Sequence, residues 1–490
     1  MKALFFLLTF FILIIGCSDS TVTQPNHDDN TNDYEIINTK DFGAIGDGIA
    51  DDTKALNNAV AAATGKVLLI EPGKYLTSGL KISGQTVIMG NSAELIASPC
   101  TGDSCEATIL VWAPLGIEGL EINCNNTSRA GIVIGNTSDI FIEGCYIYDS
   151  KKTGLTIHNS SKFIISNCII DNCTLQGMDI IFSHEGKIIN CYVNNTLHGI
   201  QWWGGDPSFS EKGVTDLVIS GNTVTNIQGG GIWGAWGDRI NIDNNNVKNC
   251  GDVGIDPEGS INSVVSDNTV KNCINAGIST FFASEQIEFT GNFIKQDDGY
   301  GHGFFFYATG WNEYMNVTGN IIHTYNKHCV GTDQFSLSSS LISDNVMIVD
   351  TDAAAIRILD GSIVNIINNQ IQIGDTRTCI AFEGVSNSLI EGNWICTGTQ
   401  LPNNIPVDEG GIHLYWRSAQ YPCQNNTIKN NVIEGFYVSI NDNCWGDHTS
   451  YNLIDGNRVE NIFYREGDYH GIIVNNYKVN SNQLVAGTGY

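Results

Sequence analysis

A repeat of about 23 residues limits most strongly what this chain can fold into. From about residue 120 to the C-terminus one pattern recurs: apolar-x-x-Asn-x-apolar, a turn, then Gly-apolar-x-apolar-x. The Asn position is filled at eleven places, namely Asn222, Asn245, Asn268, Asn292, Asn320, Asn345, Asn369, Asn393, Asn431, Asn457 and Asn482. Upstream, the same position is assigned to Cys124, Cys145, Cys168 and Cys191.

Stacked coils explain why one residue type returns at one position. Coils of this length hold short strands separated by turns, and each coil stacks on the previous one at about 4.8 Å. Asn amides in register can then satisfy one another and the turn backbone, while Cys in register acts as a small buried hydrophobe. The sequence predicts an all-β fold: a single-stranded right-handed parallel β-helix of about fourteen coils.

The first 33 residues differ in composition from the repeat. A basic start precedes an apolar run over residues 3–15, which is too short to span a membrane and is typical of a secretory signal. The run ends in Ile14-Ile15-Gly16-Cys17, which resembles a bacterial lipobox. We therefore expect a lipoprotein signal peptide (1–16), a lipidated Cys17 with a flexible acidic tether (17–33), and a β-helix domain (34–490). This organisation predicts an outer-membrane lipoprotein that faces either the periplasm or the outside.

The charge balance limits the partners of the chain. Its 24 Lys and Arg against 52 Asp and Glu give a formal net charge of −28. Such an acidic surface argues against nucleic acid and anionic membranes as partners. It also makes a densely anionic glycan an awkward ligand. We expect a monomer whose membrane contact is the lipid anchor.

The start of the repeat carries a family resemblance. The segment from Asp41 to Thr53, DFGAIGDGIADDT, resembles the N-terminal signature of the pectin-lyase-like superfamily, which includes polygalacturonases, mannuronan epimerases and phage tailspikes. From the residues themselves we expect a strand and turn, then an α-helix from Asp52 to about Ala63 that caps the open end of the solenoid. The resemblance implies the fold strongly and the reaction weakly.

One strand of each repeat presents a chemically unusual outer surface. In Gly-apolar-x-apolar-x the apolar residues point inward and the two x residues point outward. The outward residues include aromatic side chains, acids, one Arg and two His, and the last pair assigned in this way is Ser439 and Asn441. Aromatic faces stack on sugar rings, and acids and amides bind hydroxyls. We therefore expect a glycan-binding groove, with the alternative that single aromatics pack under inserted loops near 204–214, 308–315 and 401–424.

The sharpest local signal is Gly254-Ile255-Asp256-Pro257-Glu258-Gly259. Asp256 and Glu258 share one face of a strand, roughly 6.5–7 Å apart at the backbone. Pro257 breaks the rule that excludes Pro from central strands, and such breaks tend to mark functional places. Two carboxylates at this separation suit a catalytic acid and base, so we predict Asp256 and Glu258 to be catalytic. The alternative is a surface acid pair beside a turn.

Asp256-Pro257 also resembles part of the Asp-Pro-His-Glu motif of mannuronan epimerases. Glu258 replaces the His of that motif, Val253 replaces its Tyr, and Trp233 stands where a Lys is expected one coil below. These departures weaken an epimerase or lyase interpretation.

Gly301-His302-Gly303 resembles a polygalacturonase motif. The other motifs of that family are absent, or, like Asp297-Asp298, lie too close to His302. His302 is therefore interpreted as a turn residue or a supporting residue of the binding surface.

A second group of polar residues lies on later coils. Arg357 between Asp333 and Glu383 is interpreted mainly as an ion-pair ladder. Alternatively it binds a substrate carboxylate or sulfate, with His413 or Tyr415 as base in lyase chemistry. The complete set of predicted substrate-binding residues is Asp179, Gln201, Trp203, Trp233, Phe281, His302, Tyr307, Asp333, Arg357, Glu383, His413 and Tyr415.

Three functions fit these patterns. The favoured one is a polysaccharide-degrading glycoside hydrolase that uses Asp256 and Glu258. The others are a polysaccharide lyase or epimerase acting on a uronic-acid glycan, and a non-catalytic surface glycan-binding protein. The sequence predicts no metal site and no required cofactor, and it leaves open Ca²⁺ bridging the acids, although no dedicated calcium loop is present.

Overall fold

The computed structural model describes residues 35–489 apart from 91, 100–105, 308–309, 335–336, 352, 375–377, 398–409, 419, 445–450 and 466–469. The expected signal peptide, Cys17 and most of the tether lie outside the described residues. The segment Ile36–Tyr490 forms one compact unit. In the described part of the chain, no helix is long and apolar enough to cross a membrane.

The solenoid begins with a short cap. The 3-10 helix η1 (Thr39–Phe42) and strand β2 (Asp47–Asp51) lead into the helix α2 (Thr53–Ala62), which buries Leu56, Ala59 and Val60 in the core. Asp52 fixes the entry to the helix, because its carboxylate accepts the backbone N–H groups of Ile45 at 2.7 Å and Gly46 at 3.0 Å. The predicted capping helix is confirmed.

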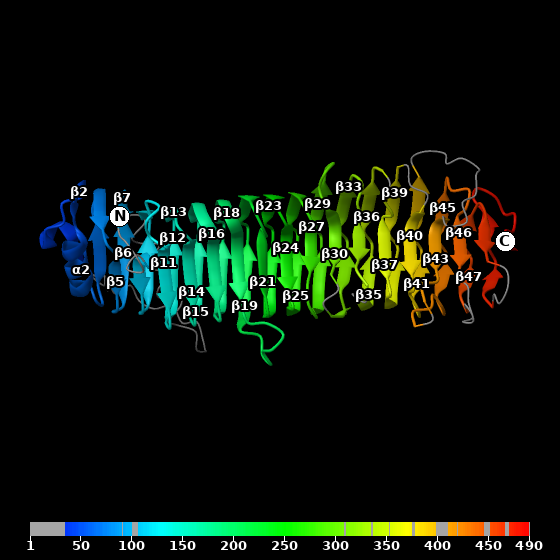
Figure 1. Cartoon of the computed structure of the whole chain (residues 1–490), viewed down its shortest axis with the longest axis horizontal. Coiled ribbons are helices and arrows are strands. Elements are labelled where there is room, and N and C mark those ends of the chain that lie inside the picture. Colours follow the sequence, from blue (N-terminus) through cyan, green and yellow to red (C-terminus); the bar gives the residue numbers. More distant parts are fainter. Residues whose placement is uncertain are drawn as a thin grey trace, which may run out of the picture. The chain divides into compact units, whose positions relative to one another are not determined.

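Three faces of parallel strands form the rest of the molecule (Figure 1). One face is a separate sheet that begins at β1 (Ile36–Asn38) and reaches β50 (Ile472–Val474). The other two faces are joined, because β16 (Ile169–Ile181) and β18 (Tyr192–Trp203) run without a break across the corner between them. The predicted all-β parallel solenoid is confirmed.

The third face carries the residues of functional interest and is called the site face. Its strands are β5 (Leu80–Ile82), β8 (Ala107–Val111), β11 (Ala130–Gly135), β14 (Thr153–His158), the second halves of β16 and β18, β21 (Ile232–Ala235), β24 (Val253–Glu258), β27 (Ala276–Thr280), β30 (His302–Phe306), β34 (Val330–Thr332), β37 (Ile356–Leu359), β40 (Thr378–Glu383), β43 (Gly410–Tyr415), β46 (Ile440–Asn443), β49 (Ile462–Tyr464) and β52 (Gly487–Gly489). The solenoid thus has about 17 turns, more than the fourteen predicted, because its first turns lack the Asn or Cys that was used for counting.

A buried ladder of Asn side chains joins the later turns. Asn245, for example, donates from Nδ2 to the carbonyl of Ile219 at 2.8 Å and to Oδ1 of Asn268 at 3.0 Å. The last member is Asn476, which accepts both N–H and Nδ2 of Asn457 at 3.0 and 2.9 Å. Asn482, assigned to this ladder from the sequence, is exposed.

The cysteine column needs one correction as well. Cys191 N–H donates to Oδ1 of Asn222 at 2.8 Å, so the cysteines run into the Asn ladder as predicted. Glu121 pairs with Tyr146, however, and this register puts Leu120 rather than Cys124 at the position of Cys145. Cys124 is buried four residues further along the same turn.

Candidate functional site

Strand register brings the predicted outward residues of the site face into one row. Asp179 pairs with Gln201, Gln201 with Trp233, and Trp233 with Asp256, on the consecutive strands β16, β18, β21 and β24. Trp203 and Glu258 lie two residues further along their strands. The predicted alternation of inward and outward residues therefore gathers these side chains on one surface.

The register corrects one outward pair near the C-terminus. His413 pairs with Asn441 and Tyr415 with Asn443, so the outward pair on β46 is Asn441 and Asn443. Ser439 is fully buried. The two-residue error arose because the turn before β46 does not follow the spacing of the earlier turns.

Pro257 interrupts the ladder at the acid pair. β24 pairs with β27 at Val253 and Ile255 only, and Pro257 beyond them has no N–H to donate. Asp256 on the same strand is 3% exposed, although it belongs to the outward row. Its Oδ1 has no hydrogen-bond partner among the described residues. A buried carboxyl oxygen without a partner is costly in a purely structural residue.

Burial and like charge keep protons on the pair. Burial raises the pKa of Asp256 well above its usual range, and the nearby charge of Glu258 acts in the same direction. Burial and the charge of Asp252 raise the pKa of Glu258 to about 7. The two carboxyl groups therefore titrate as a pair.

Two residues near the pair were missed in the sequence. Asp252 precedes β24 and accepts a hydrogen bond from Nδ2 of Asn275 at 2.5 Å, and its charge acts on both carboxyls of the pair. His198 on β18 packs against Trp233 with ring centroids 4.9 Å apart and the rings tilted by 50°. His198-Gly199 repeats the His302-Gly303 pattern just before an apolar strand, and this signal in the sequence was available.

Asp179 is a third acid on the same surface. Burial raises its pKa to about 6, and its Oδ1 has no hydrogen-bond partner among the described residues. Gln201 Oε1 and Trp233 Nε1 are buried without partners in the same way. The row therefore presents polar atoms that the protein itself leaves unpaired.

Aromatic side chains continue the surface toward the C-terminus. Phe281 and Tyr307 stack with ring centroids 3.9 Å apart and an interplanar angle of 9°. Phe305 lies 4.5 Å from Tyr307. These rings lie on the side of β24 opposite to Trp233 and Gln201, so the acid pair has aromatic neighbours in both directions along the solenoid.

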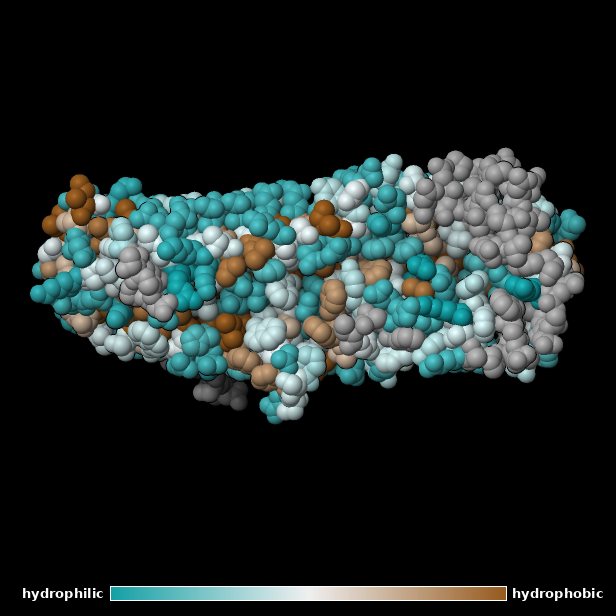
Figure 2. All heavy atoms as spheres, in the orientation of Figure 1, coloured by the Kyte–Doolittle hydropathy of each residue, from teal (hydrophilic) through white to brown (hydrophobic). Residues whose placement is uncertain are grey.

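The loop between β18 and β19 (Val214–Ser220) borders the acid pair and projects from the solenoid (Figures 1 and 2). Lys212 in this loop lies 3.7 Å from the Trp236 ring centroid and donates to the carbonyl of Gly259 at 2.5 Å. Trp236 Nε1 donates to the carbonyl of Phe209 at 3.1 Å. Trp236 is thus an aromatic that packs under an inserted loop, as the alternative interpretation proposed, whereas Trp233 lies against the tilted ring of His198.

The second predicted group contains an ion pair. Arg357 donates from Nε to Oε1 of Glu383 at 2.7 Å and from Nη2 to Oε2 at 3.1 Å. Asp333 is exposed. The rings of His413 and Tyr415 lie 5.9 Å apart. The two hydrogen bonds between Arg357 and Glu383 agree with the interpretation of these residues as an ion pair.

His302 lies on β30 and not in a turn. Its Nδ1 accepts the backbone N–H of His328 at 3.2 Å, and the two rings are 5.1 Å apart. Burial lowers the pKa of His302 to about 3, and the neighbouring His328 adds to the effect, so the ring is neutral at pH 7.

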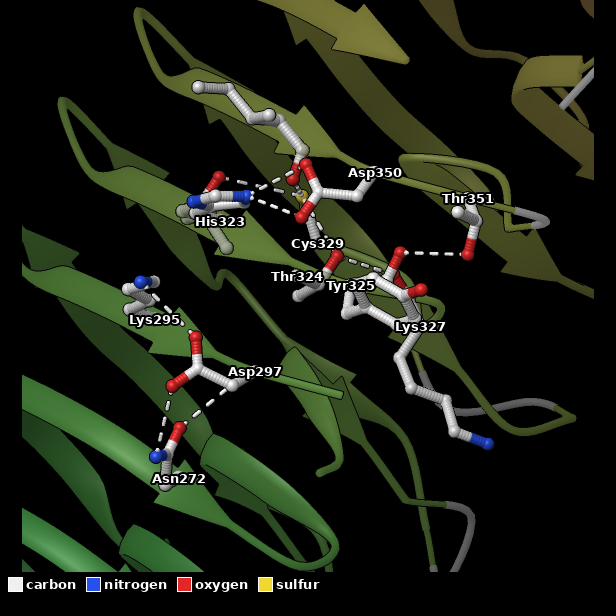
Figure 3. A network of polar contacts seen from close by, with 12 residues as sticks. Asn272, Lys295, Asp297, His323, Thr324, Tyr325, Lys327, Cys329, Asp350 and Thr351 are labelled. Carbon is white, nitrogen blue, oxygen red and sulfur yellow. Dashed lines mark hydrogen bonds and ion pairs between the residues drawn. The ribbon is translucent and has the colours of Figure 1, made fainter. Parts of the chain in front are cut away.

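Asp297, one of the two adjacent acids before His302 in the sequence, belongs to a separate network (Figure 3). Its carboxylate contacts Lys295 Nζ at 3.2 Å and accepts from Asn272 Nδ2 at 3.1 Å. Beyond it, His323 contacts Asp350 at 3.0 Å. These groups satisfy one another, which argues against a catalytic role for Asp297. Within the described ranges, no group of three or more His, Cys, Asp or Glu is placed to hold a metal ion.

Comparison with known protein families identifies the family to which this chain belongs. The family described as the right handed beta helix region matches residues 78–212 and 206–322, which together make up half of the chain. The protein belongs to this right-handed β-helix family. A second family, described as rhamnogalacturonase A/epimerase, pectate lyase-like, matches residues 36–116. The resemblance of the N-terminal segment to the pectin-lyase-like superfamily is confirmed.

Solved structures share the fold of this β-helix protein. The A-module of a mannuronan C-5 epimerase from Azotobacter vinelandii superposes with a TM-score of 0.52 at 16% identity, covering 73% of this chain and 98% of that one. A family 28 exopolygalacturonase from Yersinia enterocolitica gives 0.38 at 14% identity, covering 82% and 79%. The Dettilon tailspike protein gives 0.43 at 16%, covering 78% and 68%. No curated protein matches the sequence.

Proposed function

We propose that this β-helix protein is a polysaccharide-degrading glycoside hydrolase in which Asp256 and Glu258 are the catalytic pair. The observation that carries the proposal is the state of the two carboxyls. They lie two residues apart on β24, both have raised pKa values, and Asp256 keeps a buried oxygen without a partner. Pairs of acids whose environments hold one proton at neutral pH suit glycosidic bond cleavage.

The two residues have different roles in this proposal. Asp256 holds the proton and donates it to the glycosidic oxygen as the bond to the anomeric carbon breaks. Glu258, whose pKa is about 7, accepts a proton from the water that attacks the anomeric carbon. The two side chains hydrogen-bond to each other, so their backbone spacing does not decide between inversion and retention of configuration.

The surroundings support a carbohydrate substrate. Trp203 and Trp233 on one side and Phe281 and Tyr307 on the other offer apolar ring surfaces beside the acids. Membership of the β-helix family agrees with this proposal, although a fold alone does not fix a reaction. The lyase alternative gains little support, since the guanidinium of Arg357 is already held by both oxygens of Glu383.

Asp256→Asn and Glu258→Gln test the proposal. Each keeps the side-chain volume and removes the proton chemistry, so we expect hydrolysis to fall by at least about a thousandfold while glycan binding persists. Glu288→Gln on β28 (Glu285–Thr290), an exposed residue of another face, is the matched control and should keep full activity. Activity that survives both substitutions at the pair would refute the assignment.

We also propose that Cys17 anchors the protein to the outer membrane as a lipoprotein. The proposal rests on the apolar run and on Ile14-Ile15-Gly16-Cys17. Cys17→Ser should release the protein from the membrane fraction. Retention of this variant in that fraction would refute the anchor.

A further inference from the structure

On each of four consecutive turns of the site face, one polar atom of the outward row is buried without a hydrogen-bond partner among the described residues. The atoms are Asp179 Oδ1, Gln201 Oε1, Trp233 Nε1 and Asp256 Oδ1. Register places their residues side by side on β16, β18, β21 and β24. Gln201 and Asp256 are more than nine-tenths buried, at 8% and 3% exposure.

Such a row is costly for folding alone. A buried polar atom without a partner loses its hydrogen bonds to water and gains nothing in return. The four residues come from four separate turns, so no single local distortion accounts for them. A common outward ligand would satisfy all four atoms together.

The atoms define the chemistry of that ligand. Three are oxygens, and the fourth is the indole N–H, which can only donate. Hydroxyl groups can donate to each oxygen and accept from the indole. The row spans three strand spacings of about 4.8 Å, roughly 14 Å in total, which suits a short run of sugar residues.

The charges around the row select against anions. The acids Asp179, Asp256 and Glu258 lie on or beside it, with Asp252 near its end. The remaining positions of the two outward columns over these turns are Ile181, Gln201, Trp203, Trp233 and Ala235. None of these residues carries positive charge, and Lys212 in the bordering loop is already held by the carbonyl of Gly259 and the Trp236 ring, so a carboxylated or sulfated glycan would meet mainly acids along the row.

We infer that this row binds an uncharged, hydroxyl-rich glycan chain lying along the solenoid axis, from Asp179 to the reacting bond at Asp256. The inference rests on the proposed function for the place of the reacting bond. It goes further by naming the substrate class and by assigning Asp179 and Gln201 as specificity residues. The aromatic pair Phe281 and Tyr307 would contact the part of the chain beyond the acids.

Binding is measured on the full chain carrying Glu258→Gln, which leaves the row intact and separates binding from turnover. The probes are unsubstituted glucan, galactan, mannan and xylan, each beside its carboxymethylated derivative, in affinity electrophoresis at pH 7. We expect one neutral polymer to be retained and its carboxymethylated form to bind at least about tenfold more weakly, as expected for one lost or repelled polar contact.

Row variants locate the binding. Asp179→Ala and Gln201→Leu should each weaken retention of the neutral polymer about tenfold, the loss expected for one hydrogen bond. Neither should lower the melting temperature, because each removes an atom that has no partner in the free protein. Thr225→Val on β20 (Thr223–Ile227), which removes a buried unpaired hydroxyl on a different face, should leave retention unchanged.

The outcomes separate the two proposals. Retention of only the carboxymethylated polymers, or row variants that bind like their parent, would overturn the neutral-glycan row. Hydrolysis by the wild type of an anionic polymer would overturn the row and leave the hydrolase proposal standing. If neutral polymers are retained through Asp179 and Gln201 but the wild type hydrolyses none of them, the glycan-binding row stands and the hydrolase proposal falls.

Discussion

Asn320→Ala should destabilise the solenoid by more than the small loss of side-chain volume alone would predict. Asn320 is fully buried. Its Oδ1 accepts both N–H and Nδ2 of Asn292 at 2.9 Å. Its Nδ2 donates to the carbonyl of Phe289 at 2.9 Å and to Oδ1 of Asn345 at 3.0 Å. Removing the amide therefore breaks contacts on three successive turns.

The magnitude follows from the groups left without this partner. Two donors of Asn292 and the carbonyl of Phe289 lose a hydrogen bond in a dry interior. Each buried group of this kind costs about 1–3 kcal/mol, and such costs are not fully additive. We therefore expect a loss of roughly 3–5 kcal/mol in the free energy of unfolding.

Urea denaturation followed by circular dichroism measures the loss, with Asn482→Ala as the control. Asn482 is an exposed asparagine that the repeat pattern assigned to the same ladder. Its truncation should change stability by less than about 0.5 kcal/mol. A loss below about 1 kcal/mol for Asn320→Ala, or equal losses for both variants, would refute the amide ladder as a source of stability.

Three further outcomes are expected. The folded-state pKa of Asp179 is raised to about 6 from the usual 3.8, so the wild type loses stability as pH rises between these two values. In thermal melts, Asp179→Asn should therefore be more stable than the wild type by up to about 3 kcal/mol at pH 7.5. At pH 3 the two proteins should be equally stable. Hydrolysis should rise as pH increases through about 7, where Glu258 ionises to act as base, and a flat kcat/KM profile would contradict this role. Arg357→Gln, which breaks a partly exposed pair, should cost at most about 1 kcal/mol and leave turnover within about threefold, whereas a lyase centred on Arg357 would lose all activity.

The repeat spacing predicted the fold, and its errors lie where the spacing changes. Asn222, Asn245 and Asn268 are 23 residues apart, and all three belong to the ladder. The step from Asn457 to Asn476 is only 19 residues, so a search at the usual spacing chose Asn482 instead. At Cys124 the residue type matched but the register did not. Spacing alone cannot detect a short turn, because loop length and strand register vary independently.

The sequence predicted which way the site residues point, but not how deeply they are buried. Alternation along β24 placed Asp256 and Glu258 on the outward surface, and register then aligned Trp233 and Gln201 with them. The near-complete burial of Asp256 depends on side chains from neighbouring turns, which the strand pattern does not contain. The influence of Asp252 comes from the turn directly before β24, which the alternation along the strand does not cover.

Product analysis tests the central proposal most directly. Plant and algal polysaccharides, neutral and uronic, would be incubated with the purified protein and followed for new reducing ends and for the ultraviolet absorbance of unsaturated uronates. Hydrolysis by Asp256 and Glu258 predicts new reducing ends without that absorbance, and their loss in Glu258→Gln. Reducing ends accompanied by the absorbance would contradict the account and identify a lyase.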